Sequence, residues 1–177
     1  MMEDLFTAYL SIGSNKGDKK ENLNLAIESL ENHTLIRVVA VSSFYKTQPQ
    51  NFEDQDWFVN AALKIETPAQ PEELLDILKQ IERSLDKEGK AFRFGPRIID
   101  LDIIYFQNRI VKTQYLDIPH PRMQERCFVL RPLRDIGADT LHPVLDKTPE
   151  QLLKIIEKQT RQEVILLDQE ATDEVFY

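Results

Sequence analysis

The chain has 177 residues, 42% of them hydrophobic and 29% charged, a balance typical of one globular domain rather than a disordered chain. Its formal net charge of −8 argues against broad nucleic-acid binding, because a phosphate backbone attracts a basic surface. No stretch approaches the roughly 18 apolar residues of a membrane span, so we expect no membrane association.

The first part of the chain predicts a strand, a helix and a second strand. Residues 7–13 alternate in polarity and end at a glycine, which predicts a strand that runs into a turn. Within 19–32, leucine and isoleucine recur at the spacing of an amphipathic helix. Residues 34–47 are rich in Val, Ile, Ser, Thr and Tyr, which predicts one long strand.

A second strand–helix–strand unit follows. The polar segment 48–56 predicts a loop, and 57–66 predicts a strand. Pro71 opens a helix with an apolar stripe, and a charged loop at 89–96 leads to 98–106, the strongest strand pattern in the chain. The order β-α-β-β-α-β predicts an α+β fold of the ferredoxin-like kind, in which an antiparallel sheet carries two helices on one face.

The remainder predicts loop and helix additions to this core. Residues 119–132 form a proline-rich segment, and 148–151 (Thr-Pro-Glu-Gln) predict the start of one further helix with a capping box. The tail contains one apolar run, 164–167. We expect a single domain over 1–158 and a tail at 159–177 that forms no separate domain.

Asp100-Leu101-Asp102 carries the clearest chemistry. Side chains two apart on a strand share a face, about 6–7 Å apart, while Ile99, Leu101 and Ile103 would face the core. Paired carboxylates suit Mg²⁺ beside substrate phosphates. Two such ions, ~3.5–4 Å apart, could clamp a transferring phosphoryl group. The same pattern also occurs on ordinary surface strands and in sugar transferases.

Two basic clusters stand out in this acidic chain and could hold a small polyanion such as a nucleotide, although solvated charge runs are the alternative. They are Lys87, Lys90, Arg93 and Arg97, and Arg122, Arg126, Arg131 and Arg134. Arg97 directly precedes the acidic strand, where its guanidinium could bind phosphate oxygens with paired hydrogen bonds. The sequence contains neither a P-loop nor the protein-kinase motifs.

A possible ring-binding pair is Phe58 and Asn60, which share one side of their predicted strand while Trp57 and Val59 point the other way. An aromatic ring stacks on flat ligands, and an amide can read a ring edge. Phe58 could instead be a core residue, and Asn60 could cap a turn. His120, between two prolines, either binds a phosphate or anchors its loop.

Residues 93–104 (RFGPRIIDLDII) resemble the signature of the 6-hydroxymethyl-7,8-dihydropterin pyrophosphokinase family. Four other stretches resemble the same family: 8–15 (AYLSIGSN), 41–47 (VSSFYKT), 58–62 (FVNAA) and 120–133 (HPRMQERCFVLRPL). The resemblance covers about residues 7–158, in order and without large gaps.

The resemblance implies that a pterin hydroxymethyl oxygen attacks the β-phosphorus of ATP, giving AMP and the pterin diphosphate in folate biosynthesis. It implies catalytic roles for Arg97, Asp100 and Asp102, the two aspartates holding two Mg²⁺ ions. The positions that it assigns to ATP are Glu82, Lys87, Lys90, Arg97, His120 and Arg126. The positions that it assigns to the pterin are Thr47, Gln48, Gln50, Phe58, Asn60, Phe94 and Phe128.

The chain departs from the family pattern at five positions. Phe94 stands where tryptophan is common, Lys87 where arginine occurs, and Phe58 where the family has tyrosine. Tyr115 and Asp117 do not match the arginine and threonine expected near the nucleotide, so the resemblance gives them no role.

Two other functions remain open at this level: another Mg²⁺-dependent nucleotidyl or glycosyl transferase, and a binding module without catalysis. We expect small-molecule substrates and a monomer. Cys127 is the only cysteine, so no intrachain disulfide is possible, and we expect a reducing compartment, by default the cytoplasm.

Overall fold

The structure is a computed structural model that describes residues 4–50, 53–88, 93 and 95–167. The strands are β1 (Phe6–Ser14), β2 (Arg37–Val41), β3 (Tyr45–Thr47), β4 (Phe58–Thr67), β5 (Asp100–Phe106), β6 (Val111–Lys112), β7 (Asp117–Ile118) and β8 (Val164–Leu166). The helices are α1 (Lys19–Glu31), α2 (Pro71–Leu85), α3 (Cys127–Ile136), α4 (Pro149–Ile156) and the short 3₁₀ helix η1 (Met123–Glu125).

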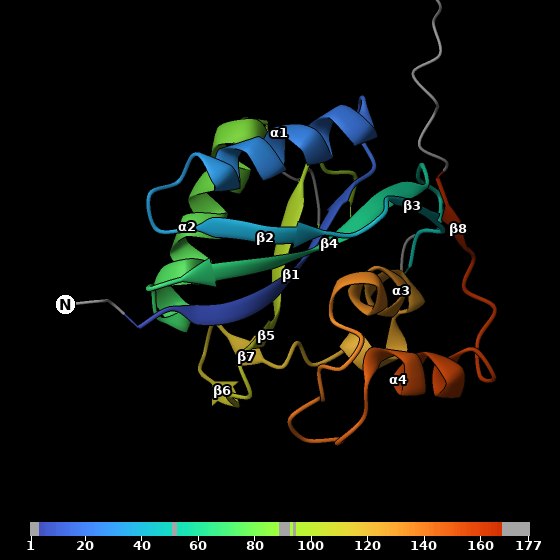
Figure 1. Cartoon of the computed structure of the whole chain (residues 1–177). Helices are drawn as coiled ribbons and strands as arrows, with labels where there is room; N and C mark the ends of the chain where they lie inside the picture. Colours follow the sequence, from blue (N-terminus) through green and yellow to red (C-terminus); the bar gives the residue numbers. More distant parts are fainter. Residues whose placement is uncertain (1–3, 51–52, 89–92, 94, 168–177) are drawn as a thin grey trace, which may run out of the picture.

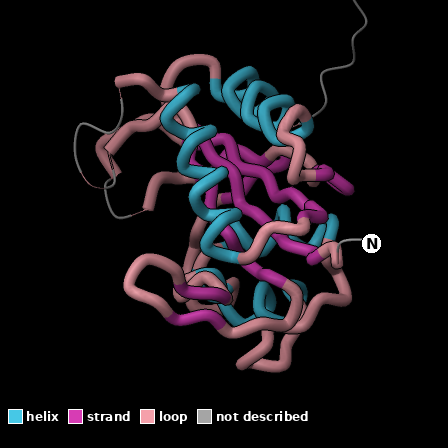
Figure 2. Tube along the Cα trace, turned by 90° about the vertical axis from the view of Figure 1, so that its left-hand side faces the viewer, coloured by secondary structure: helices cyan, strands magenta, loops and turns pink. Residues whose placement is uncertain are grey.

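One antiparallel sheet has the strand order β5-β1-β4-β3-β8, and β2 also pairs with β4. The strands β6 and β7 form a separate hairpin, which lies below the sheet in both views (Figures 1 and 2). The predicted ferredoxin-like order is confirmed: β5, β1 and β4 follow one another across the sheet, β2 and β3 both pair with the far side of β4, and α1 and α2 are the crossovers. None of the described helices is long and apolar enough to cross a membrane.

The main core lies between the sheet and the pair α1 and α2 (Figure 1). Alternate residues of the central strands, including Leu10, Leu63 and Leu101, are fully buried in it. Leu74 and Leu78 of α2 are also fully buried there, as the helical spacing predicts.

The opposite face of the sheet carries α3 and α4 over a second apolar cluster. The helix α3 was not predicted, because the 119–132 segment is proline-rich and Pro132 lies inside the helix. Leu130 and Leu133 of α3 are fully buried in the second cluster, so tertiary packing outweighs the unfavourable local sequence. The predicted α4 begins, as expected, with the capping box of Thr148 and Gln151.

The single long strand predicted over 34–47 is wrong, because the chain bends between β2 and β3. At the bend, the Ser42 N–H donates to the Ala62 carbonyl at 2.9 Å, and the Ser42 hydroxyl accepts the Ala62 N–H at 2.8 Å. A side chain thus replaces one backbone acceptor of the ladder, and both short strands can pair with β4.

Two further elements differ from the predictions. Gly13 lies inside β1 rather than in a turn. The apolar run of the tail forms β8, which pairs antiparallel with β3 and buries Val164 in the second cluster. The tail therefore reaches the strand that leads into the 48–56 loop.

Candidate active site

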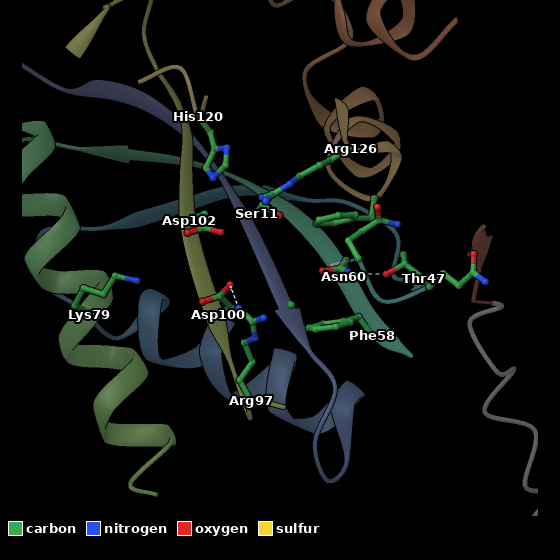
Figure 3. A pocket seen from close by; sticks show the side chains of 14 residues that line it. Ser11, Thr47, Phe58, Asn60, Lys79, Arg97, Asp100, Asp102, His120 and Arg126 are labelled. Atoms are coloured by element: carbon green, nitrogen blue, oxygen red, sulfur yellow. Dashed lines mark hydrogen bonds and ion pairs between the residues drawn. The ribbon is translucent and has the colours of Figure 1, made fainter. Parts of the chain in front are cut away.

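A cavity of about 270 Å³ opens on the face of the sheet that carries α3 (Figure 3). Its floor comes from β5, β1, β4 and the end of β3, and its opposite wall comes from the segment around α3. The lining residues are Ser11, Gly13, Thr47, Gln48, Gln50, Phe58, Asn60, Lys79, Arg97, Asp100, Asp102, His120, Arg126 and Phe128.

Asp100 and Asp102 project from β5 into this pocket (Figure 3). Their neighbours Ile99, Leu101 and Ile103 are at most 4% exposed on the core side of the strand, which confirms the predicted alternation. The apolar side of β5 therefore forces both carboxylates onto the pocket side.

The two carboxylates share a half-buried, electrostatically crowded position. Burial, together with the nearby Asp100 charge, raises the pKa of Asp102 to about 7. Lys79 and Arg126 act in the opposite direction, and Glu82 adds to the increase. A cation placed between the carboxylates would remove this repulsion.

Arg97 spans the acidic and aromatic parts of the pocket. Its Nη1 lies 2.9 Å from Asp100 Oδ2, and its guanidinium carbon lies 5.4 Å from the centre of the Phe58 ring. Its Nε is buried and has no hydrogen-bond partner in the part of the chain that the structure describes, so it can still donate to a ligand oxygen.

The backbone of Arg97 is held by Asn15, which is 2% exposed. The Arg97 N–H donates to Asn15 Oδ1 at 3.0 Å, and the Asn15 N–H donates to the Arg97 carbonyl at 3.2 Å. The Asn15 amide also donates to Gln55 Oε1 and the Asp56 carbonyl. The end of β1 thus fixes Arg97 relative to the loop before β4.

The other end of the pocket combines two aromatic rings with buried polar groups. Asn60, 4% exposed, donates from Nδ2 to the Thr47 hydroxyl at 2.6 Å. The Phe58 ring lies on the same side of β4 (Figure 3). Phe128 of α3 also lines the pocket. Gly13 is required beneath them, because a Cβ there would overlap Asn60 Oδ1 and lie 3.4 Å from Asn60 Cγ.

His120 is a neutral donor at the upper rim. Burial and the nearby Arg126 cation lower the pKa of His120 to about 4. The Arg122 N–H donates to His120 Nδ1 at 3.2 Å, so the neutral ring carries its proton on Nε2. That N–H and the Arg126 guanidinium can both meet ligand oxygens.

The structure brings together eleven of the fifteen site residues predicted from the sequence. Glu82 lies behind β5, where its Oε1 accepts the Leu101 N–H at 2.7 Å, and it is outside the lining. Lys87 is exposed after α2 and is also outside the lining. Lys90 and Phe94 lie outside the described residues.

Sequence reasoning missed three lining residues: Ser11, Gly13 and Lys79. Lys79 precedes Glu82 by three residues on α2, and its Nζ lies 3.0 Å from Glu82 Oε2. This i,i+3 spacing could have placed Lys79 beside the predicted Glu82 from the sequence. Glu82 raises the pKa of Lys79 against the opposing effect of burial. Ser11 and Gly13 alternate along β1, which places both on one face.

The chain resembles pyrophosphokinases over most of its length. The family model of 7,8-dihydro-6-hydroxymethylpterin-pyrophosphokinase (HPPK) matches residues 9–138. A 2-amino-4-hydroxy-6-hydroxymethyldihydropteridine pyrophosphokinase of Bacillus subtilis is 45% identical over 129 residues, 73% of this chain and 77% of the relative. One of the same name from Aquifex aeolicus is 35% identical, over 84% of this chain and 94% of the relative.

The chain belongs to the HPPK family. Membership confirms the family and the class of activity predicted from the sequence: ATP-dependent pyrophosphate transfer to hydroxymethyl-dihydropterin in folate biosynthesis.

Some relatives are much longer than this HPPK chain. It is 44% identical to a folic acid synthesis protein of Dictyostelium discoideum over 81% of its own length, but spans only 22% of that relative. A crystal structure of a Plasmodium falciparum HPPK-DHPS triple mutant matches with a TM-score of 0.72 at 17% identity, over 89% of this chain and 45% of that chain. The structural match supports the α+β fold alone.

The residues present fit the magnesium that HPPK chemistry implies. Asp100 and Asp102 offer hard oxygen ligands, and their mutual repulsion is the kind that a cation relieves. No group of three or more metal-ligating side chains occurs in the ranges that the structure describes. Such a pair leaves room for ligand phosphates, which Mg²⁺ commonly shares with one or two carboxylates.

We predict that Gly13→Ala weakens pterin binding about tenfold or more, because the new methyl group displaces Asn60 from Thr47 and breaks a buried hydrogen bond. Calorimetry should show this loss for the pterin in the presence of an ATP analogue, with little change for the analogue alone. The matched control is Gly137→Ala, where a Cβ would lie 2.9 Å from Tyr9 Cε1, outside the pocket lining. Equal losses for both ligands would contradict the assignment of this end of the pocket to the ring.

We predict that the magnesium-free protein loses stability as the pH rises through about 7 because of Asp102. Its pKa is raised on folding, so the folded state holds a proton that the unfolded state releases near pH 4. Asp102→Asn should therefore be more stabilising, relative to wild type, at pH 8 than at pH 5. Urea melts in a chelating buffer test this, with the exposed Asp139→Asn as the control. A stability difference that does not vary with pH would contradict the prediction.

Proposed function

We propose that this pocket transfers the pyrophosphate of ATP to 6-hydroxymethyl-7,8-dihydropterin, giving AMP and the pterin diphosphate. One observation carries the proposal: a ring-binding end and a phosphate-binding end share a single cavity, and Arg97 contacts residues of both. A bond forms between the hydroxymethyl oxygen and the β-phosphorus, and the bond from that phosphorus to the AMP oxygen breaks.

The ring-binding end would hold the pterin. We assign Phe58 and Phe128 to stacking against the ring, because aromatic faces bind flat ligands from both sides. Asn60 and Thr47, joined by a 2.6 Å hydrogen bond, present polar groups to the ring edge at a fixed angle. Gln48 and Gln50 supply the remaining polar wall on that side.

The phosphate-binding end would hold the triphosphate. Arg97 from below and Arg126 from above place guanidinium groups on two sides of the carboxylate pair (Figure 3). Each can bind phosphate oxygens with paired hydrogen bonds, and His120 adds a neutral donor. Phosphoryl transfer depends mainly on such positioning and charge neutralisation.

We assign two Mg²⁺ ions to Asp100 and Asp102. When bound, such ions would neutralise the charge that builds on the transferring group. Lys79 stands beside Asp102 and compensates part of the carboxylate charge when fewer cations are bound. Glu82 would act on ATP indirectly, by orienting Lys79 and the β5 backbone rather than by lining the cavity.

We also propose a monomeric, cytoplasmic enzyme. The only cysteine, Cys127, is buried and free, which suits a reducing compartment.

The nucleotide product tests the proposal. We predict that incubation with ATP, Mg²⁺ and hydroxymethyl-dihydropterin yields AMP and the pterin diphosphate in equal amounts. A nucleotidyl transferase would instead release pyrophosphate, and a binding module would release nothing. Formation of ADP would contradict the proposal.

The controls for this assay are Asp100→Ala and Asp102→Ala. Each should lower turnover by about 10²–10³ or more, because charge stabilisation in the transition state is lost. Both variants should still fold, since neither side chain packs in an apolar cluster. Activity that falls only together with the melting temperature would count against a catalytic role.

A further inference from the structure

Gln162, in the tail, makes two hydrogen bonds to the backbone on either side of Arg126. Gln162 Nε2 donates to the Glu125 carbonyl at 2.7 Å, and Gln162 Oε1 accepts the Cys127 N–H at 2.9 Å. One side chain thus brackets Arg126 from both sides. Its amide pairs with the segment 125–127 as a neighbouring strand would pair.

This contact supplies a hydrogen-bond acceptor that the N-terminus of α3 lacks. The N-cap residue of α3 is Arg126, and its side chain makes no capping hydrogen bond. The first N–H groups of a helix lack intrahelical acceptors, and Cys127 supplies one of them. Gln162 provides the acceptor from 35 residues further along the chain.

The backbone of residues 125–127 sets the positions of Arg126 and Phe128, which line the pocket from this side. Cys127 is 1% exposed and packs in the second cluster, while its neighbours Arg126 and Phe128 line the cavity. The Arg126 guanidinium carbon lies 5.6 Å from the centre of the Phe128 ring, so the two side chains are also placed against each other. A shift of the 125–127 backbone would move a phosphate-binding and a ring-binding group together.

The residues on both sides of Gln162 are held by hydrogen bonds and an ion pair. Arg131 Nη1 donates to the Val164 carbonyl at 2.8 Å, and Arg131 Nη2 lies 2.8 Å from Glu157 Oε1. On the other side, the Gln48 N–H donates to the Glu163 carbonyl at 3.2 Å. The tail around Gln162 therefore connects both walls of the cavity.

We propose that Gln162 is a positioning residue for the pyrophosphokinase reaction, which holds Arg126 and Phe128 at the angle that the two substrates require. The proposal rests on the function proposed above. Gln162 lies beyond residues 9–138, the part that matches the family model, so this chain supplies part of the support for the site from its tail.

The test is Gln162→Met, which keeps the length of the side chain and removes both hydrogen bonds. Calorimetry with an ATP analogue and Mg²⁺ present should show pterin binding weakened roughly tenfold, the size expected when Arg126 and Phe128 must also be ordered on binding. In a Phe128→Ala background the same substitution should weaken pterin binding much less, because the ring-binding side chain that Gln162 positions is already gone and only Arg126 remains.

The matched control is Gln151→Met, which removes another glutamine contact, the 2.9 Å bond from the Thr148 N–H in the α4 capping box. It should lower the melting temperature and leave pterin binding unchanged. If Gln162→Met does not fold, Gln162→Glu replaces it: the carboxylate keeps an acceptor for Cys127 but turns an oxygen toward the Glu125 carbonyl in place of the donor, so a loss of similar size is expected.

Pterin binding equal to wild type in the folded Gln162 variant would overturn the proposal, as would an equal loss with and without Phe128. Because binding is measured without turnover, failure of the proposed function has a different signature: wild-type protein that binds pterin and forms no AMP.

Discussion

The repulsion between Asp100 and Asp102 is the constraint on which the rest of the site depends. The apolar side chains of β5 must face the main core, so both carboxylates are forced onto the pocket side. Burial and the nearby Asp100 charge then raise the pKa of Asp102, because both disfavour its charged form. Positive side chains from three parts of the chain partly neutralise the carboxylate charge: Lys79 on α2, Arg97 before β5, and Arg126 at the start of α3. Such an arrangement is tolerable without ligand and most favourable with cations bound.

Hydrogen bonds from outside the pocket fix the backbone that carries the lining residues. Leu101, between the two aspartates, donates its N–H to Glu82 of α2 at 2.7 Å, which fixes the outer side of β5. Asn15 fixes the backbone of Arg97, and Gln162 fixes the backbone around Arg126. Each supporting residue reaches the site from another part of the sequence, so β5 and the two arginines are held by long-range hydrogen bonds rather than by their own loops. Such preorganisation lowers the entropy that must be lost at the transition state.

Local sequence patterns predicted much of this structure. The elements and residues that they did not predict depend on contacts between distant parts of the chain. Alternation along 98–106 predicted both the strand and the faces of its aspartates, and helical spacing predicted α1, α2 and α4. The motif around Arg97 predicted the chemistry. Helix α3 was missed because Pro132 argues against a helix locally, and only the burial of its leucines outweighs that. Gly13 and Gln162 gave no local signal, since their partners Asn60 and Cys127 lie in other elements.

The most direct test of the central claim is the number of divalent ions that the carboxylate pair holds. Paramagnetic resonance of free Mn²⁺, titrated into the protein with a non-hydrolysable ATP analogue, counts the bound ions. With two carboxylates facing the phosphates, two ions per chain are expected, and Asp102→Asn should lose at least one of them. Unchanged ion binding in Asp102→Asn, or a single ion in the wild type, would contradict the view that this pair assembles the reaction centre.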